Sequence, residues 1–316
     1  RMATYKGTVW ASWDEQAPDF ETYLGDAIVH LDMALDCRDG RPGGAEVIGI
    51  HKWVFPSNWK FAAENFLGDT YHNPSHRSVD MIGIGPSAQR GTKGRRDNEL
   101  EGAQHVWISF PEGHGVHSAV GPEHREYVES FQDDPEIEAY FRHCFAERNR
   151  RLGEHARLMP FVGTIFPNTS YHGGQPRGLC AWHPHSPNET EAWRFFFVDA
   201  DAPAAVKDFL RRYYMRYSGP AGMTEQDDME NWLYATAAST GTVARRYAFN
   251  YQQSLHATRI HPVVNGLQVR GEVATQISEH MARGFYRRWD SYMHDAGWDV
   301  LLGGGDARFE GVRVAE

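Results

Sequence analysis

Short strand-forming segments spread along the whole chain constrain its fold most. Runs rich in β-branched and aromatic residues predict strands, and they lie at 8–12, 47–54, 105–110, 163–166, 179–183 and 192–198. These segments are separated by stretches of very different length, so they lack the regular strand–helix–strand phasing of a parallel sheet. The sequence therefore predicts an α+β fold in which helices cover one face of an antiparallel sheet.

Apolar residues at helical spacing predict three long helices. Two of them span 135–152 and 203–216. The third has an apolar residue at every fourth position: Ile277, Met281, Phe285, Trp289 and Met293. Such a stripe is typical of a helix face buried in the core. Because no linker or repeat interrupts the pattern, residues 1–316 are predicted to form a single domain.

The composition excludes several kinds of partner. The 316 residues are 41% hydrophobic and 13% aromatic, which is enough to bury a large core. A formal net charge of −10 leaves no basic excess to neutralise phosphates, so we expect no nucleic-acid partner. There is no apolar run of about 18 residues and no signal-peptide pattern, so we expect no membrane segment. Three widely spaced cysteines favour a cytoplasmic location.

Residues 64–76, ENFLGDTYHNPSH, concentrate metal-binding side chains in a short segment. Asp69, His72 and His76 lie within eight positions, behind the amide of Asn65. Two histidines cannot fill the coordination sphere of a metal ion, so a third ligand is expected elsewhere in the chain. The best candidate is the acidic cluster at 225–230, which follows a Gly/Pro turn. Two histidines and one carboxylate on one face of an octahedral ion leave three positions open, as in non-haem iron(II) oxygenases. Zinc hydrolases use the same ligand types, so the ligands alone leave the metal undecided.

The stretch 58–78, NWKFAAENFLGDTYHNPSHRS, resembles the mononuclear-iron motif of Rieske-type aromatic-ring-hydroxylating dioxygenase alpha subunits, the biphenyl and naphthalene dioxygenase group. Three further segments resemble this family in the same order: TIFPNTS at 164–170 with WHP at 182–184, EQDDMENW at 225–232, and GFYRRW at 284–289. The resemblance thus covers nearly the whole chain. It implies a helix-grip, TBP-like fold with iron and substrate held between the sheet and the long helices.

The resemblance also implies roles for particular residues. His72, His76 and Asp228 take the iron-ligand positions, and Asp69 takes the position that links the iron to its electron donor. The resemblance implies a catalytic role for Asn65 as well as for Asp69. The positions implied to contact substrate are Asn65, Phe66, Asn73, Ser218 and Thr224. Three residues separate the two histidines where many relatives have four, and we expect the loop around Pro74 to absorb the difference.

One part of the family pattern is missing. A Rieske [2Fe–2S] cluster needs a Cys-x-His and a later Cys-x-x-His, but the cysteines are Cys37, Cys144 and Cys180, and none begins a Cys-x-His. The single Cys-x-x-His, Cys180-Ala-Trp-His183, lies in a predicted strand, and we interpret it as a coincidence. The Rieske domain is therefore predicted to be absent from this chain, and the cluster to belong to the full-length subunit.

The function that the resemblance implies is cis-dihydroxylation of a hydrophobic aromatic substrate, of one ring or several, by mononuclear iron(II) and dioxygen. Electrons would pass from NADH through a reductase and a ferredoxin to a Rieske cluster on a neighbouring subunit. The implied assembly is a trimer of alpha subunits, with or without beta subunits.

Two functions of other classes stay open at the level of sequence. The cavity could bind an apolar ligand without turnover, or the same ligands could hold zinc in a hydrolase. The acids Asp227 and Asp228 could also simply complement a helix N-terminus.

Overall fold

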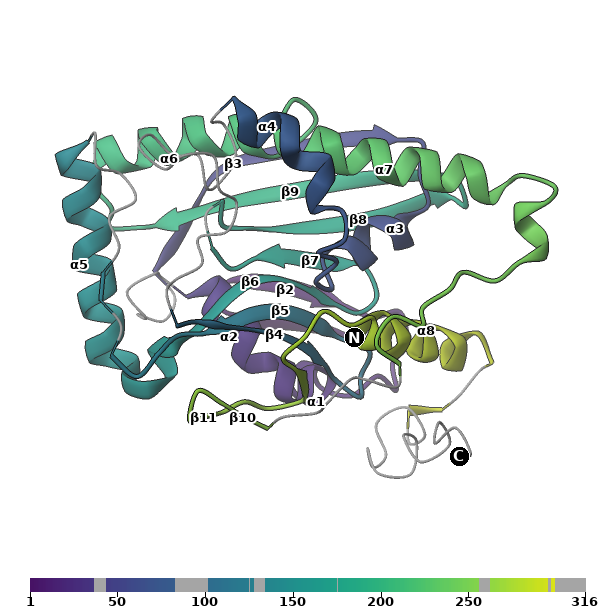
Figure 1. Cartoon of the computed structure of the whole chain (residues 1–316), viewed down its shortest axis with the longest axis horizontal. Coiled ribbons are helices and arrows are strands. Elements are labelled where there is room, and N and C mark those ends of the chain that lie inside the picture. The colour runs from purple at the N-terminus through teal and green to yellow at the C-terminus, as the bar shows by residue number, and fades with distance from the viewer. Residues whose placement is uncertain are drawn as a thin grey trace.

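An eight-stranded antiparallel sheet forms the centre of the molecule. The computed structural model describes residues 1–36, 44–82, 102–124, 126–127, 134–174, 176–255, 262–294 and 297–298. The strand order is β12-β4-β5-β6-β7-β8-β9-β3, and every neighbouring pair is antiparallel (Figure 1). The predicted antiparallel sheet is therefore confirmed.

The sheet strands are β3 (Ala45–Phe55), β4 (Gln104–Ser109), β5 (Gly115–Val120), β6 (Leu158–Ile165), β7 (Thr169–His172), β8 (Gly178–Ser186), β9 (Glu189–Asp199) and β12 (Glu272–Ala274). Two small hairpins pair β1 (Met2–Tyr5) with β2 (Thr8–Ala11), and β10 (Val263–Val264) with β11 (Leu267–Gln268). The α-helices are α1 (Phe20–Leu24), α2 (Ile28–Leu35), α3 (Trp59–Asn65), α4 (Arg77–Met81), α5 (Pro135–Leu152), α6 (Ala204–Tyr217), α7 (Met223–Ser239) and α8 (His280–Met293). Short 3₁₀ turns are η1 (Gly25–Ala27), η2 (Asn73–His76), η3 (Gly153–Arg157) and η4 (Ala244–Arg246).

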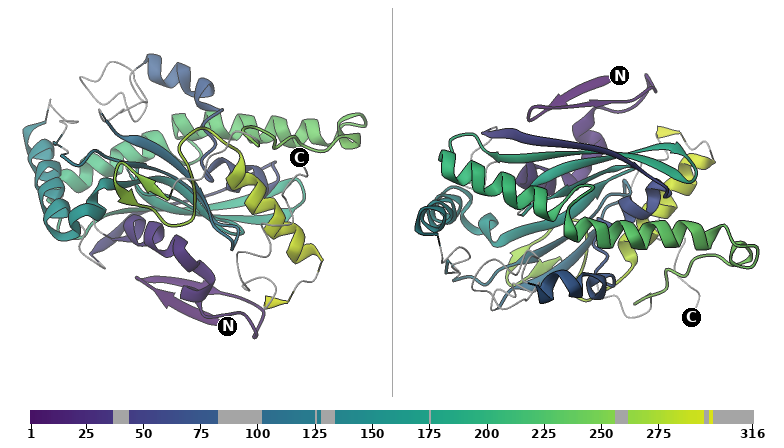
Figure 2. Two further views of the ribbon diagram at one scale, coloured as in Figure 1. Left: turned by 60° about the horizontal axis from the view of Figure 1, so that its bottom comes forward. Right: turned by 90° about the horizontal axis from the view of Figure 1, so that it is seen from above.

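Helices cover both faces of the sheet, so the prediction of helices on one face was wrong. Residues of α1 and α2 pack with Val106 and Ile108 of β4 in one core cluster. The neighbouring Trp107 belongs to a second cluster with residues of α3, α7 and α8. Because successive side chains of a strand point to opposite faces, these clusters lie on opposite sides of the sheet. Figure 2 shows the purple N-terminal segment on one side and α6 and α7 on the other.

The long predicted helices form, but the apolar stripe of the last one is only partly core. Met281 and Phe285 are buried, whereas Met293 is 63% exposed and Ile277, which precedes α8, is 43% exposed. A four-residue step overshoots a 3.6-residue turn by about 40°. Residues at the two ends of a long stripe therefore turn away from the face that its centre buries.

Strand β9 alternates strictly between the two faces of the sheet. Thr190, Ala192, Arg194, Phe196 and Val198 are buried on the face that α3, α6 and α7 cover. Arg194 is the charged residue in this row, and a charge buried in this way needs a buried partner.

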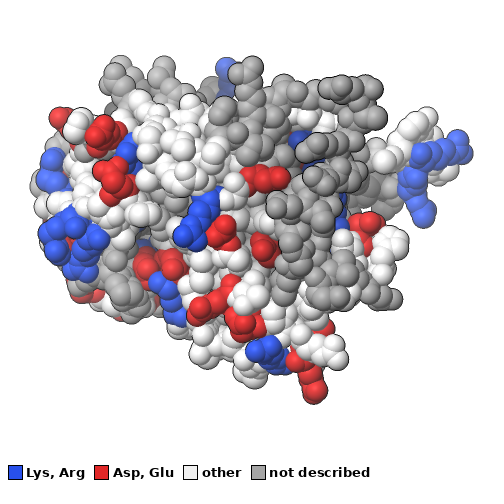
Figure 3. Space-filling view, turned by 90° about the horizontal axis from the view of Figure 1, so that it is seen from below, with Lys and Arg blue, Asp and Glu red and all other residues white. Residues whose placement is uncertain are grey.

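Charged side chains of both signs are interspersed on the face seen in Figure 3, with no extended basic region among its described residues. Within the described part of the chain, no helix is both long and apolar enough to cross a membrane.

Candidate metal centre

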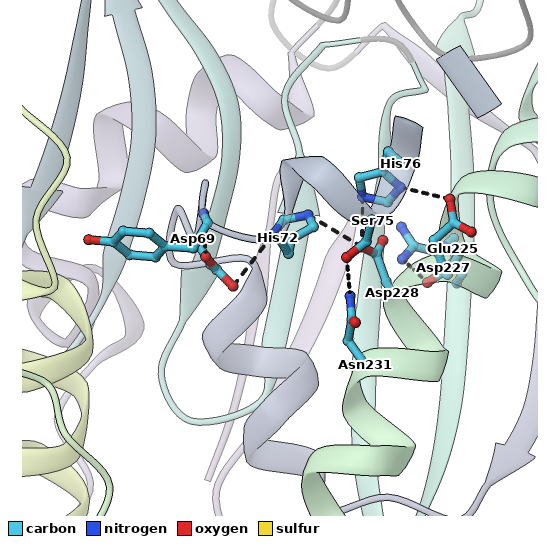
Figure 4. A network of polar contacts seen from close by, with 10 residues as sticks. Asp69, His72, Ser75, His76, Glu225, Asp227, Asp228 and Asn231 are labelled. Carbon is cyan, nitrogen blue, oxygen red and sulfur yellow. Dashed lines mark hydrogen bonds and ion pairs between the residues drawn. The ribbon is translucent and has the colours of Figure 1, made fainter. Parts of the chain in front are cut away.

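Three side chains from two distant segments converge on one point. His72 and His76 come from the segment between α3 and α4, and Asp228 comes from α7 (Figure 4). The Nε2 atoms of His72 and His76 lie 3.3 Å and 2.9 Å from Oδ1 of Asp228. One donor atom from each residue lies within 4.8 Å of the others. The three positions that the sequence proposed as metal ligands are thus brought together.

The backbone around the two histidines differs from an α-helix. His72 lies in a turn and His76 ends the 3₁₀ turn η2, in which Pro74 occupies an early position. The tighter turn brings both imidazoles to the same point with three residues between them. His76 is only 1% exposed, so a solvated helix face does not account for it.

A carboxylate stands behind each imidazole. Asp69 Oδ2 lies 3.5 Å from Nδ1 of His72, and Asp227 Oδ2 lies 3.2 Å from Nδ1 of His76. Each Nδ1 faces a carboxylate, and a proton on Nδ1 would leave the lone pair of Nε2 for a metal ion. This role of Asp227 was not predicted from the sequence, although its position directly before Asp228 is a signal that could have suggested it.

The spacing of the donor atoms fits a transition-metal ion. Bonds of about 2.1 Å to two ligands at right angles place those ligands about 3 Å apart. The distances from Asp228 Oδ1 to the two imidazole nitrogens agree with this separation. Two imidazoles and one carboxylate also form the donor set of a facial triad. The residues therefore fit a bound iron(II) ion.

Removing the carboxylate behind His76 is expected to weaken metal binding. Asp227→Ala should raise the Kd for iron(II) by about 10- to 100-fold, because the ring loses its orientation and part of its basicity. An anaerobic iron titration measures this. The exposed neighbour Gln226 provides the control, since Gln226→Ala should leave the Kd unchanged. Equal affinities for Asp227→Ala and the unmodified chain would mean that Asp227 does not support His76.

The segment that carries Asp69 is fixed by α3 and by a required glycine. Asn58 caps α3 by accepting a hydrogen bond from the Lys60 N–H at 3.1 Å. Gly68 then has a φ of 115°, and a Cβ atom there would lie 2.8 Å from Cβ of His117. Only glycine suits this position. Beyond it, Asp69 Oδ1 accepts a hydrogen bond from the Tyr71 N–H at 2.8 Å.

Helix α3 is held against α8 by a carboxyl group. Tyr251 and Tyr286 donate their hydroxyl hydrogens to Glu64 Oε2 at 2.9 Å and 2.6 Å. Burial raises the pKa of Glu64 to about 7, although the two hydroxyls oppose this. Next to Glu64, Asn65 provides the last residue of the helix.

A buried ion pair supports α7 from beneath. Arg194 of β9 donates a hydrogen bond to Glu225, which lies three residues before Asp228. Glu225 also accepts a hydrogen bond from the Gly219 N–H. Burial disfavours the charged guanidinium, but Glu225 outweighs this and the pKa of Arg194 is raised. This pair was not predicted from the sequence, where the only signal for it was a charged residue, Arg194, among the apolar residues of a predicted strand.

The predicted substrate positions lie in different environments. Phe66 is buried, with its ring centroid 5.4 Å from the guanidinium carbon of Arg194. Ser218 and Thr224 are also buried and flank the turn that leads into α7. Asn73 is exposed at the start of η2, and Asn65 is half-buried.

The Cys-x-x-His of β8 does not form a cluster site. Cys180 is fully buried, whereas His183 is exposed, and the odd spacing places them on opposite faces of the strand. Cys37 lies outside the described residues, and so does a short basic run in the sequence, KGRR at 93–96.

Comparison with known proteins identifies the family. Residues 20–295 match the model of the ring hydroxylating alpha subunit, catalytic domain. The chain belongs to this family. The chain is 37% identical over 310 residues to biphenyl dioxygenase subunit alpha of Paraburkholderia xenovorans (strain LB400), covering 95% of this chain and 64% of that protein.

Two further proteins are similar to nearly the whole chain. Benzene 1,2-dioxygenase subunit alpha of Pseudomonas putida is 35% identical over 310 residues, covering 95% of this chain and 65% of the relative. A solved structure of naphthalene 1,2-dioxygenase with indole bound in the active site matches with a TM-score of 0.77 at 27% identity, covering 95% of this chain and 66% of that one. The chain thus spans less than two thirds of the length of these curated relatives.

Proposed function

We propose that this chain holds one iron(II) ion between His72, His76 and Asp228 and serves the cis-dihydroxylation of an aromatic ring by dioxygen. The observation that carries the proposal is the convergence of both Nε2 atoms on the Asp228 carboxylate, with a second carboxylate behind each imidazole. When bound there, iron(II) supplies the redox centre that activates dioxygen. Family membership and the aromatic substrates named for the relatives support the same reaction.

The residues of the chain have separate tasks in this proposal. Asp69 and Asp227 orient the two imidazoles and keep their Nδ1 protons away from the ion. Glu225 and Arg194 fix the first turns of α7 and hence the position of Asp228. Phe66 supplies an apolar surface beside the site, and Asn65, Asn73, Ser218 and Thr224 are the further positions proposed to contact substrate.

We propose that electrons enter through Asp69. Its side chain is 32% exposed while its Oδ2 atom faces His72, so it connects the surface with a ligand of the ion. The donor would be a Rieske [2Fe–2S] cluster on a neighbouring subunit, reduced from NADH by a reductase and a ferredoxin. The complete enzyme would be a trimer of alpha subunits, with or without beta subunits.

The test of this path is Asp69→Asn in the complete enzyme with its electron donors. The amide keeps the shape of the side chain but loses its charge, so we expect iron and substrate binding to persist. The turnover rate, measured as product formed per iron per unit time, should fall to a small fraction of normal. Asp208→Asn on the exposed side of α6 is the matched control. Normal turnover by Asp69→Asn would refute this electron path.

A further inference from the structure

Residues 240–250 form an arm that continues α7 beyond the edge of the sheet (Figure 1). All eleven residues of the arm are exposed, and so is Tyr234 near the end of the helix. The large apolar side chains of the arm are Val243, Tyr247 and Phe249, which are 64%, 74% and 60% exposed. Neighbouring apolar side chains that stay in solvent mark a surface that binds another molecule.

The arm has a defined backbone that displays two arginines. The N–H groups of Arg245 and Arg246 each donate a backbone hydrogen bond of 3.0 Å, and these bonds close the turn η4. Where the arm returns to the body of the molecule, the ring of Phe249 lies 5.9 Å from that of Phe61 on α3. The two exposed arginines therefore stand on a short turn between exposed apolar side chains.

The arm belongs to a basic stretch of an acidic sequence. Positions 231–271 contain four Arg and no Asp, Glu or Lys, so this stretch carries a formal charge of +4. The whole chain carries −10, so the rest of the chain carries −14. Because opposite charges attract, the arm is electrostatically complementary to the remainder of another copy of the same chain.

An acidic surface with exposed apolar residues lies near the N-terminus. Positions 7–37 contain seven acidic residues and no Lys or Arg. Trp13 is 104% exposed, and Met2 and Val9 of the preceding hairpin are exposed as well. These three residues form what we call the Trp13 surface, together with the exposed acids Asp14, Glu15, Asp19, Glu21 and Asp26. Arg1 contacts it at the Ala17 carbonyl and Arg270 at Asp26, which leaves an acidic excess.

The two surfaces have matching chemistry. A guanidinium group stacks on the face of an indole ring and pairs with carboxylates at the same time. Trp13 with Asp14 and Glu15 directly after it offers both kinds of partner to Arg245 and Arg246. The exposed apolar side chains on each surface would be buried in the same contact.

The arm and the Trp13 surface lie on opposite sides of the sheet. The N-terminal hairpin packs through Tyr5 and Trp10 on the core cluster that includes residues of α1 and α2. Helix α7, which carries the arm, contributes to the cluster on the other side. Figure 2 shows the same separation. Complementary surfaces on opposite sides of one molecule meet between copies, head to tail, in a closed ring or an open chain.

We propose that the arm binds the Trp13 surface of a second copy of this chain, with Arg245 and Arg246 against Trp13 and its neighbouring carboxylates. The inference goes beyond the proposed function, because neither the iron site nor the reaction enters the argument. An arm of eleven residues is smaller than one side of a standard interface, which has about 20–30 residues. The association is therefore expected to be of micromolar strength.

Sedimentation velocity of the unmodified chain over about 1–100 µM tests the association. We expect a mass that rises above the monomer's 35.9 kDa with concentration. An arm variant, Arg245→Glu with Arg246→Glu, should raise the Kd by at least about tenfold, because like charges would then face each other. The matched control reverses two adjacent exposed arginines of α6, Arg211→Glu with Arg212→Glu, and should leave the Kd unchanged. Circular dichroism reports that each variant is folded.

Mixing two variants tests the head-to-tail geometry. A receptor variant, Trp13→Ser with Glu15→Lys, keeps its arm, whereas the arm variant keeps its Trp13 surface. Each variant alone should be a monomer at concentrations where the unmodified chain associates. An equimolar mixture should form a one-to-one dimer and nothing larger, because one intact arm and one intact receptor remain. A contact between two identical surfaces would not give this result.

Three results would overturn the inference: an unmodified chain that stays monomeric over the whole range, association that survives in the arm variant, or two variants that do not combine when mixed. Vesicles of phosphatidylserine and phosphatidylcholine test the other occupant that a basic, aromatic arm fits. If the unmodified chain stays monomeric and binds these vesicles, and the arm variant does not, the arm binds an anionic membrane rather than a second copy.

Discussion

Replacing Asp228 by alanine is expected to weaken iron(II) binding by at least an order of magnitude. Asp228 provides the only anionic member of the proposed triad, and its Oδ1 atom lies within 3.3 Å of both imidazole nitrogens. Without it the site keeps only two imidazoles, and a site with fewer ligands binds divalent ions far less well. The measurement is iron content after anaerobic loading and desalting, with circular dichroism to show that the helices remain.

Glu230 offers a matched control for this substitution. It lies two residues further along α7 and is exposed, so Glu230→Ala should leave iron content unchanged. We expect a similar loss of iron content for His72→Ala and for His76→Ala. Full iron occupancy in Asp228→Ala would remove this residue from the site and direct the search to Asp227.

Breaking the buried pair beneath α7 is expected to give the largest loss of stability. Arg194 is 1% exposed, so Glu225→Ala would leave its guanidinium buried without its counter-charge. Removing one member of such a pair costs about 3–5 kcal/mol of unfolding free energy. Urea denaturation followed by tryptophan fluorescence measures the change.

Two controls separate burial from charge in this experiment. Asp208→Ala breaks the exposed pair with Arg212 on α6 and should cost less than about 1 kcal/mol. The double variant Arg194→Met with Glu225→Leu should cost much less than the two single changes added, because no charge is left buried. A loss under about 1 kcal/mol for Glu225→Ala would contradict the structural role assigned to the pair.

The sequence predicted the sheet where local pattern was strong. The runs that became β3, β4, β8 and β9 have clear β-forming composition, and the helix at 135–152 has the bounds of α5. Strand β7 has only four residues, and β5, with the sequence GVHSAV, has weak β-forming composition. These two strands form through pairing with their neighbours, which a single-sequence pattern does not contain.

The proposed ligands could be nominated from sequence because the histidine motif is compact and the acid cluster resembles a family segment. The residues that support these ligands could not be predicted from the sequence. Arg194 and Glu225 are 31 positions apart, and their pairing depends on how α7 lies across β9. The alignment of His117 and His172 on either side of Val162 likewise depends on strand register. Such juxtapositions depend on tertiary structure rather than on local composition.

The central claim is that His72, His76 and Asp228 together hold one iron ion. Crystals grown anaerobically with iron(II), with anomalous scattering recorded on both sides of the iron absorption edge, test it most directly. We predict a single iron peak bonded at about 2.1 Å to the Nε2 atoms of both histidines and to the Asp228 carboxylate, with the remaining positions open to solvent. An iron peak elsewhere, or a site that holds zinc and excludes iron under the same conditions, would contradict the claim.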